Sequence, residues 1–184
     1  MKTFNLGEIT PETEDEIISA IKAGKIFVYP TDTIYGLGCN AENTEAVKKI
    51  KEIKSRDAAK PMSVIAPSMQ WILDNMKTNE KYVKMYLPGP YTLILKKKDS
   101  EFLNEASSYP TLGVRIPSHK FTEIIQKTGV PFITTSVNLS GEKPLTNTSA
   151  LSEEIKEKID YVIDSGELNG KPSTLILNGQ SVMR

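Results

Sequence analysis

The sequence predicts a single α/β domain over residues 1–184, built on a mixed and mostly buried sheet with flanking helices. Short runs of β-branched and aromatic residues alternate along the chain with segments whose apolar residues recur at helical spacing. Such alternation favours helices layered on a sheet. The length suits one sizeable core, and 39% hydrophobic with 25% charged residues is typical of a globular protein.

The first two elements are a helix and a buried strand. Thr10 can cap the free amides of a helix, and Pro11 suits its first position. Gly24 can end this helix as a left-handed cap. Residues 26–29 are a short apolar run stopped by a proline, which predicts a buried strand.

The same alternation continues to the end of the chain. Further helices are predicted from apolar positions within residues 46–53, 71–72, 82–86, 121–125 and 151–159. Further strands are predicted at residues 62–65, 91–95, 112–116, 132–135, 161–163 and 173–177. The sequence leaves the order and direction of these strands open.

Composition excludes several classes of function. Lys plus Arg and Asp plus Glu both total 23, so the overall charge does not favour nucleic acid or an anionic membrane. Cys39 is the only cysteine and His119 the only histidine, which excludes an internal disulfide and Cys-based or His-rich metal sites. No apolar run approaches a signal peptide or a membrane span, so a cytoplasmic protein is expected.

Four polar segments follow predicted strands or helices, where open α/β sheets usually bind ligands. The first, residues 30–38, combines hydroxyls, a carboxylate and a phenol with two glycines that permit close backbone approach. A capped turn with a packed tyrosine explains it equally well. The second is a dense basic stretch at residues 48–60.

Within the basic stretch, the early lysines fit a solvated helix face. Lys54, Arg56 and Lys60 lie where the helix should end, so they can converge on an anion. Arg offers a planar fork for phosphate oxygens and Lys a mobile point charge. The stretch is therefore a candidate triphosphate clamp.

The third and fourth segments follow predicted strands. Arg115 lies at a strand end, Ser118 can cap the next helix, and a lone His119 is more often structural than a ligand. Residues 134–141 offer hydroxyls and an amide, which suit a nucleotide or an amino acid. The glycines of a nucleophile elbow are absent around Ser136, and a Ser-His-Asp hydrolase is not expected.

The common nucleotide-binding motifs are also missing. Residues 166–173 superficially suggest a P-loop, but they are one residue short between glycines and have a proline between Lys171 and Ser173. No dinucleotide-binding glycine fingerprint follows a strand.

As an ordered set, the polar segments closely resemble the YrdC-like threonylcarbamoyl-AMP synthase family, in its minimal single-domain form. The matching pieces are YPTDTIYGLG at 29–38, KSR at 54–56, KPM at 60–62, PGPYTLIL at 88–95, VRIP at 114–117 and SVNLSG at 136–141. The resemblance implies a twisted α/β fold with a large concave cavity. It also implies synthesis of threonylcarbamoyl-AMP from L-threonine, bicarbonate and ATP with release of pyrophosphate.

Position by position, the resemblance assigns roles to eleven residues of this chain. Lys54 and Arg56 are the expected catalytic residues. The ATP side comprises Lys54, Arg56, Lys60, Arg115, Ser136, Asn138 and Arg184. The threonine side comprises Thr33, His119, Thr134 and Ser173. Mg²⁺ is expected to accompany ATP, with no protein ligands assigned to it.

The implied mechanism needs no protein nucleophile. The threonine amine captures carbon dioxide or bicarbonate, and the resulting carbamate attacks the α-phosphorus, so positioning and charge stabilisation supply the catalysis. The product would pass to proteins that complete N6-threonylcarbamoyladenosine at position 37 of tRNA.

Two departures and two alternatives accompany the resemblance. Asp57 stands where many relatives have proline, and Ile65 stands where many have a histidine near the amino acid, which weakens the case for threonine. One alternative is a non-catalytic double-stranded RNA-binding or ribosome-maturation module. The other is a YciO-like paralogue with an altered substrate.

Overall fold

The computed structural model describes residues 1–54, 60–138, 143–168 and 170–183, and these residues form one mixed sheet with flanking helices. Ten strands lie in the order β1-β8-β2-β3-β7-β4-β6-β5-β9-β10. The strands are β1 (Lys2–Asn5), β2 (Phe27–Tyr29), β3 (Gly36–Gly38), β4 (Ser63–Ile65), β5 (Tyr91–Lys96), β6 (Thr111–Arg115), β7 (Phe132–Ser136), β8 (Tyr161–Asp164), β9 (Thr174–Leu177) and β10 (Gln180–Val182). The predicted α/β class is confirmed.

The sheet contains both parallel and antiparallel strand pairs. Pairs β1/β8, β2/β8, β4/β6 and β5/β9 are parallel, and β2/β3, β3/β7, β4/β7, β5/β6 and β9/β10 are antiparallel. The helices are α1 (Pro11–Lys22), α2 (Thr44–Ile53), α3 (Met69–Asn75), α4 (Glu80–Lys84), α5 (Lys120–Thr128) and α6 (Glu153–Lys156), with short 3₁₀ turns at Leu6–Glu8 and Thr148–Ala150. None of the described helices combines the length and apolar character that crossing a bilayer requires.

Helix α1 begins and ends as its sequence predicts. The Thr10 side chain accepts a hydrogen bond from the backbone N–H of Thr13, and Pro11 occupies the first helical position. Gly24 adopts φ +76° just beyond the helix, in the left-handed region that glycine tolerates best. These local signals suffice because each acts within a few residues.

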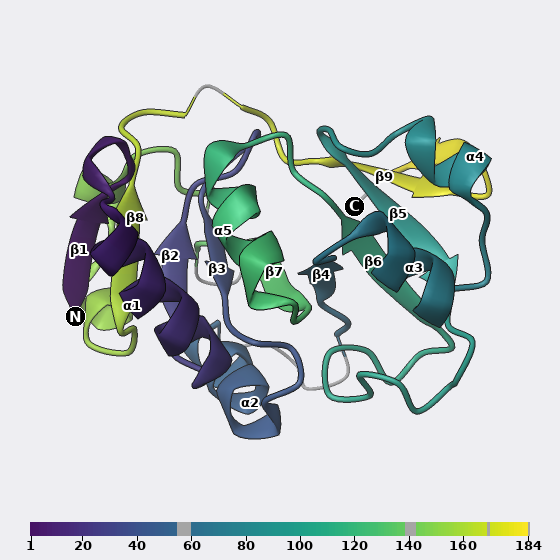
Figure 1. Cartoon of the computed structure of the whole chain (residues 1–184), viewed down its shortest axis with the longest axis horizontal. Coiled ribbons are helices and arrows are strands. Elements are labelled where there is room, and N and C mark those ends of the chain that lie inside the picture. Colours follow the sequence, from purple (N-terminus) through teal and green to yellow (C-terminus); the bar gives the residue numbers. More distant parts are fainter. Residues whose placement is uncertain (55–59, 139–142, 169, 184) are drawn as a thin grey trace.

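Helices α1 and α5 lie side by side over one face of the sheet (Figure 1). Ile17, Ile21 and Phe121 pack there with Phe27 and Phe132 in one apolar cluster. Successive side chains of a strand point to opposite faces, and residues of β2 therefore enter both apolar clusters.

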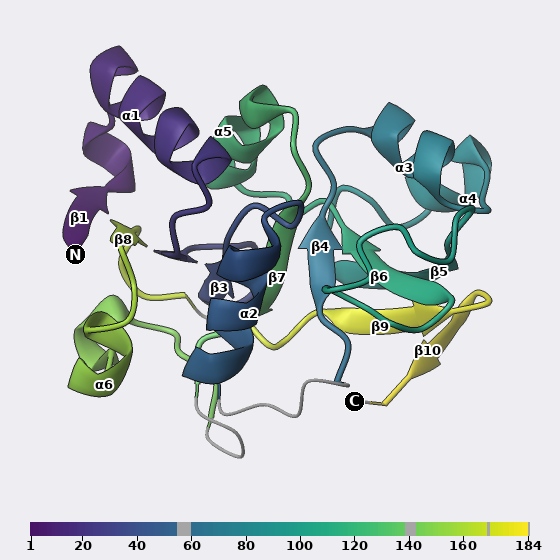
Figure 2. The same cartoon turned by 90° about the horizontal axis from the view of Figure 1, so that it is seen from below.

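The second apolar cluster includes the remaining residue of β2, Val28, together with residues of α2, which Figure 2 shows in front of β3. Val47, Ile50 and Ile53 of α2 are buried there with Val28 and Leu37. The same cluster continues to α3 and α4, which cover the β5 and β6 end of the sheet. Packing on both sides explains why the strands are mostly buried.

Three strands were not predicted, and each lacks the apolar run that marks a buried strand. β1 and β10 end the sheet, and their residues are largely exposed. β3 contains two glycines because its neighbours leave no room for a side chain. A Cβ at Gly36 would lie 2.7 Å from the Tyr29 ring, and one at Gly38 would lie 2.1 Å from the Ile133 carbonyl oxygen.

The helix predicted over residues 151–159 is wrong in length. Leu151, Ile155 and Ile159 are all buried, as their spacing suggested. Only Glu153–Lys156 is α-helical, and a 3₁₀ turn precedes it. Apolar residues in short irregular segments can share a buried face without one continuous helix.

Candidate functional site

A cavity of about 540 Å³ lies over the middle of the sheet. Its floor is a row of residues placed side by side by strand register. Thr134 of β7 pairs with Ser63 of β4, Ser63 with Gly113 of β6, and Gly113 with Ile94 of β5. All four line the cavity.

All the predicted site residues that the structure describes, except His119, line this cavity. They are Thr33, Lys54, Lys60, Arg115, Thr134, Ser136, Asn138 and Ser173. They come from five regions far apart in the sequence, and the fold brings these regions together around one cavity. Their roles toward a substrate stay predictions.

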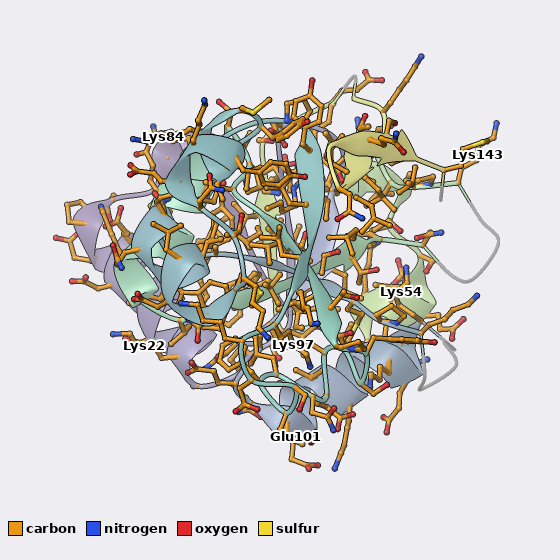
Figure 3. The ribbon with its side chains drawn as sticks, turned by 90° about the vertical axis from the view of Figure 1, so that its right-hand side faces the viewer. Lys22, Lys54, Lys84, Lys97, Glu101 and Lys143 are labelled. Carbon is orange, nitrogen blue, oxygen red and sulfur yellow. The ribbon has the colours of Figure 1, made fainter. Side chains whose placement is uncertain are left out.

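Lys54 ties the end of α2 to the loop that follows β7. Its Nζ donates hydrogen bonds to the carbonyl oxygens of Ser136 (2.6 Å) and Asn138 (3.0 Å) and to Asn138 Oδ1 (2.9 Å). The residue is only 5% exposed, and Figure 3 shows it within the molecule while Lys143 extends outward. These three acceptors are uncharged oxygen atoms, and they fix the position of the ammonium group beside the loop.

Arg115 forms a buried ion pair with Asp32 at the wall of the cavity. One terminal nitrogen of Arg115 donates to Asp32 Oδ1, and the other lies 3.5 Å from Thr33 Oγ1. Burial lowers the pKa of Arg115, and the Asp32 carboxylate opposes that shift. The positive charge of Arg115 is thus balanced by the Asp32 carboxylate within the protein. In a simple phosphate clamp, the bound phosphate would balance that charge.

Hydroxyl groups surround the Thr33 corner of the cavity. Thr31 Oγ1 donates to the Ile34 carbonyl oxygen (2.7 Å) and accepts from Thr33 N (3.1 Å), which fixes the turn between β2 and β3. Two further lining residues, Ser173 and Thr92, have hydroxyls that lie 2.8 Å apart. This end of the cavity can donate and accept hydrogen bonds without adding charge, as an amino-acid side chain with a hydroxyl would require.

His119 lies outside this cavity. It caps α5, where its Nδ1 accepts a hydrogen bond from the backbone N–H of Phe121 (3.3 Å), and it lines a separate depression of about 380 Å³ with Pro88 and Gln126. The cap predicted for Ser118 is therefore wrong. Ser118 instead donates its backbone N–H to Asp32 Oδ2 (2.9 Å). The resemblance placed His119 near threonine, but the fold turns it toward the helix end.

Three of the positions discussed above fall outside the described residues, namely Arg56, Asp57 and Arg184. Ile65 is described and fully buried in the apolar cluster beneath α5. Its register partner in β6 is Arg115. The position at which many relatives carry histidine is therefore apolar in this chain.

The sequence interpretation missed several residues that line or support the cavity. It treats Asp32 only as a carboxylate in a turn, and the pairing of Asp32 with Arg115 is evident only in the fold. Gly113 keeps the cavity floor low, because a Cβ there would lie 2.3 Å from Ser63 Oγ. A glycine in the middle of an apolar strand was the available signal. Thr92 and Leu175 carried no signal beyond their strands.

The described residues contain no group of three or more His, Cys, Asp or Glu side chains that could hold a metal ion. The Asp32 carboxylate, which lies next to the cavity residue Thr33 in the chain, is already paired with Arg115. Mg²⁺ usually binds few protein carboxylates and keeps water or phosphate oxygens as its other ligands. The residues fit a metal that is carried by phosphate better than one that is bound by the protein alone.

Comparison with known proteins gives consistent matches over most of the chain. The family model Sua5_yciO_yrdC, described as Telomere recombination, matches residues 19–184. A protein of Methanocaldococcus jannaschii, provisionally named threonylcarbamoyl-AMP synthase, is 36% identical over 95% of this chain and 86% of its own length. The threonylcarbamoyl-AMP synthase of Vibrio campbellii is 28% identical over 88% of this chain and 91% of its own length.

Among solved structures, Pyrococcus abyssi Sua5 complexed with L-threonine has a TM-score of 0.84 and 30% identity. The match covers 95% of this chain and 54% of the Sua5 chain, so this chain spans about half of that protein. Escherichia coli YciO has a TM-score of 0.81 at 22% identity, which shows a common fold.

Proposed function

Because the chain belongs to the Sua5/YciO/YrdC family, we propose that it is an L-threonylcarbamoyladenylate synthase. It would convert L-threonine, bicarbonate and ATP into threonylcarbamoyl-AMP and pyrophosphate. The observation that carries the proposal is that basic groups and hydroxyl groups line the same cavity. Relatives that match most of the chain bear the name threonylcarbamoyl-AMP synthase.

The basic side of the cavity suits the triphosphate. Lys60 lines it from an exposed position, and Lys54 contributes a buried positive charge beside Ser136 and Asn138. Preorganised cations of this kind stabilise charge that develops on phosphate oxygens. Arg56 and Arg184 stay assigned to ATP by resemblance alone.

The hydroxyl side suits the amino acid. Thr33, Thr134 and Ser173 line the cavity, and the paired Asp32 and Arg115 stand behind Thr33. A relative of closely similar structure was crystallised with L-threonine. We place the amino acid at this end of the cavity and the triphosphate toward Lys54 and Lys60.

With both substrates in place, the reaction requires positioning more than covalent help from the protein. The threonine amine adds to carbon dioxide derived from bicarbonate and loses a proton, giving a carbamate. A carbamate oxygen then forms a bond to the α-phosphorus while the bond from that phosphorus to the bridging oxygen breaks and pyrophosphate leaves. Mg²⁺ would enter with ATP and neutralise phosphate charge.

The product is a mixed anhydride, so a further group-transfer reaction must consume it. We propose that proteins acting on tRNA receive it for N6-threonylcarbamoyladenosine at position 37, and that this takes place in the cytoplasm, where ATP and tRNA are found.

The test is pyrophosphate release measured with each substrate omitted in turn. Release that requires L-threonine, bicarbonate and ATP together supports the proposal. Release with another amino acid in place of L-threonine would indicate a paralogue with an altered substrate. A protein without turnover but with strongly salt-dependent RNA affinity would instead be an RNA-binding module.

Substitution of Lys60 sharpens the same test. Lys60→Met should lower kcat/KM for ATP by about tenfold or more, because one cation facing the triphosphate is lost. Lys48→Met is the matched control, since Lys48 is exposed on α2 and pairs with Glu45. Equal effects of the two substitutions on kcat/KM would contradict the assignment of Lys60 to the ATP site.

A further inference from the structure

The connection from β8 to β9 crosses the molecule from one end of the sheet to the other (Figure 1). β8 lies between β1 and β2, whereas β9 lies beyond β5. The described residues of this connection are 165–168 and 170–173. Its last residue, Ser173, lines the cavity. The path therefore brings a distant segment to the amino-acid end of the site.

Gly170 lies directly against the backbone of Thr33. A Cβ at Gly170 would be 1.8 Å from the Thr33 carbonyl oxygen and 2.3 Å from its carbonyl carbon. Backbone atoms cannot rotate away as a side chain can. Thr33 is also held from behind, because its N–H donates to Thr31 Oγ1. Only a residue without a side chain can approach Thr33 so closely.

The start of the connection is held by the hydroxyl of Tyr35. This buried hydroxyl donates to the Gly166 carbonyl oxygen (2.7 Å) and accepts from the Ser165 N–H (3.0 Å). Asp164 Oδ1 accepts from Gly166 N (3.2 Å) and from Thr148 Oγ1 (2.7 Å). Tyr35 belongs to the same turn region as Thr33, so one short segment contacts the connection at two places.

The end of the connection is held by β5. The hydroxyls of Ser173 and Thr92 lie 2.8 Å apart, and Thr174 N donates to the Pro90 carbonyl oxygen (3.0 Å). Between the two ends, Leu168 N donates to the Thr146 carbonyl oxygen (2.8 Å). With both ends fixed, the contact at Gly170 determines how far the connection stands from Thr33.

We propose that the described residues of this connection, 165–168 and 170–173, form a specificity-determining wall, in which Gly170 sets the distance between Thr33 and Ser173 and Tyr35 is a positioning residue. The inference rests on the proposed function, because it takes Thr33 and Ser173 as the amino-acid end of the cavity. A side chain at position 170 would push the wall outward. The pocket would then hold L-threonine less tightly and reject larger amino acids less well.

The experiment compares the kinetics of wild type, Gly170→Ala and Tyr35→Phe in pyrophosphate release. Gly170→Ala should raise KM for L-threonine by about tenfold and leave KM for ATP within about twofold, since the triphosphate end lies toward Lys60. It should also reduce the preference for L-threonine over L-isoleucine. Tyr35→Phe keeps the buried ring and loses only the hydroxyl, so a smaller change in the same direction is expected.

Gly129→Ala is the matched control. Gly129 ends α5 with φ +75° and has open space around it, so alanine there strains the backbone without contacting the cavity. Its kinetic constants should equal those of wild type at a temperature where both are folded. If Gly170→Ala does not fold, Tyr35→Phe decides the question alone.

The outcomes separate the two proposals. A wild-type protein without release dependent on L-threonine contradicts the proposed function. The proposed wall is overturned if the wild type is active but the variants leave KM for L-threonine unchanged. It is also overturned if the variants raise KM for L-threonine and KM for ATP equally. A selective rise in KM for L-threonine in Gly170→Ala, or in Tyr35→Phe where Gly170→Ala does not fold, supports it.

Discussion

At the scale of single residues, His119 shows how position in the fold determines chemistry. Its Nδ1 caps α5 by accepting from Phe121 N, which requires that nitrogen to be unprotonated. Burial lowers the pKa of His119 below its ordinary value of 6.5, and the Asp32 carboxylate partly opposes the shift. Lys120 and Glu123 line the same depression. The residue is thus a helix cap whose strength depends on pH.

Replacing His119 with asparagine should remove part of the pH dependence of stability. With a lowered folded pKa, the folded state binds fewer protons than the unfolded state as pH falls below 6.5. The contribution of His119 therefore favours folding above pH 6.5 and is lost as pH falls through the folded pKa. His119→Asn keeps a capping side chain that does not titrate.

Thermal unfolding at about pH 5 and about pH 7.5 measures this effect. The difference in Tm between the two values should be smaller for His119→Asn than for wild type. Gln126→Asn, in the same depression, changes no titrating group and serves as the control. An identical pH dependence in wild type and His119→Asn would contradict the assignment.

At the scale of elements, Lys97 holds the segment between β5 and β6. It is only 2% exposed, and its Nζ donates to the carbonyl oxygens of Phe102 and Ser107, both at 3.0 Å. Figure 3 shows Lys97 inside the molecule and Glu101 of the same segment at its surface. The segment also accepts a hydrogen bond from Met62 N at the Ala106 carbonyl oxygen (2.8 Å). Met62 lines the cavity, so this segment supports one of its walls.

Lys97→Met should lower the free energy of unfolding by about 1–3 kcal/mol, because the two carbonyl groups lose a buried donor. Urea unfolding followed by circular dichroism measures the change. Lys96→Met is the control, since Lys96 is exposed on the preceding position of β5. A loss of the same size in both variants would show that the hydrogen bonds of Lys97 contribute nothing measurable.

At the scale of the whole molecule, the cavity joins parts that lie far apart in sequence. The Lys54 bonds to the loop after β7 connect α2 with the centre of the sheet, and the β8 to β9 connection spans both ends. A ligand that contacts these walls together should stabilise the folded state as a unit. Ligands that bind only the folded state raise its stability by mass action.

ATP with Mg²⁺ should therefore raise Tm, and at 100 times its Kd the gain is about 2.7 kcal/mol. Adenosine, which lacks phosphates, should give little shift at the same concentration. Chelating Mg²⁺ should reduce the shift, since the described residues offer no metal-binding cluster to replace the phosphate ligands. An equal shift with and without Mg²⁺ would count against the metal as part of the substrate.

Elements were predictable where one local pattern sufficed. The caps of α1 and the apolar faces of α2 and α5 act within a few residues, and the structure confirms them. β3 was missed because its glycines make room for groups from elsewhere in the chain, namely the Tyr29 ring and the Ile133 carbonyl group. The helix predicted over residues 151–159 was too long, because buried apolar residues at helical spacing do not require a continuous helical backbone.

For this protein, the sequence by itself determined the α/β class, most of its helices and strands, and the set of polar segments that form the cavity. These depend on periodicity, capping and motif order, which are local properties of the chain. Only the tertiary structure decided that Asp32 pairs with Arg115, that His119 faces a helix end, and that Gly170 lies on Thr33. Such contacts join residues separated by long stretches of chain, and they arise from strand order and register, which no local pattern specifies.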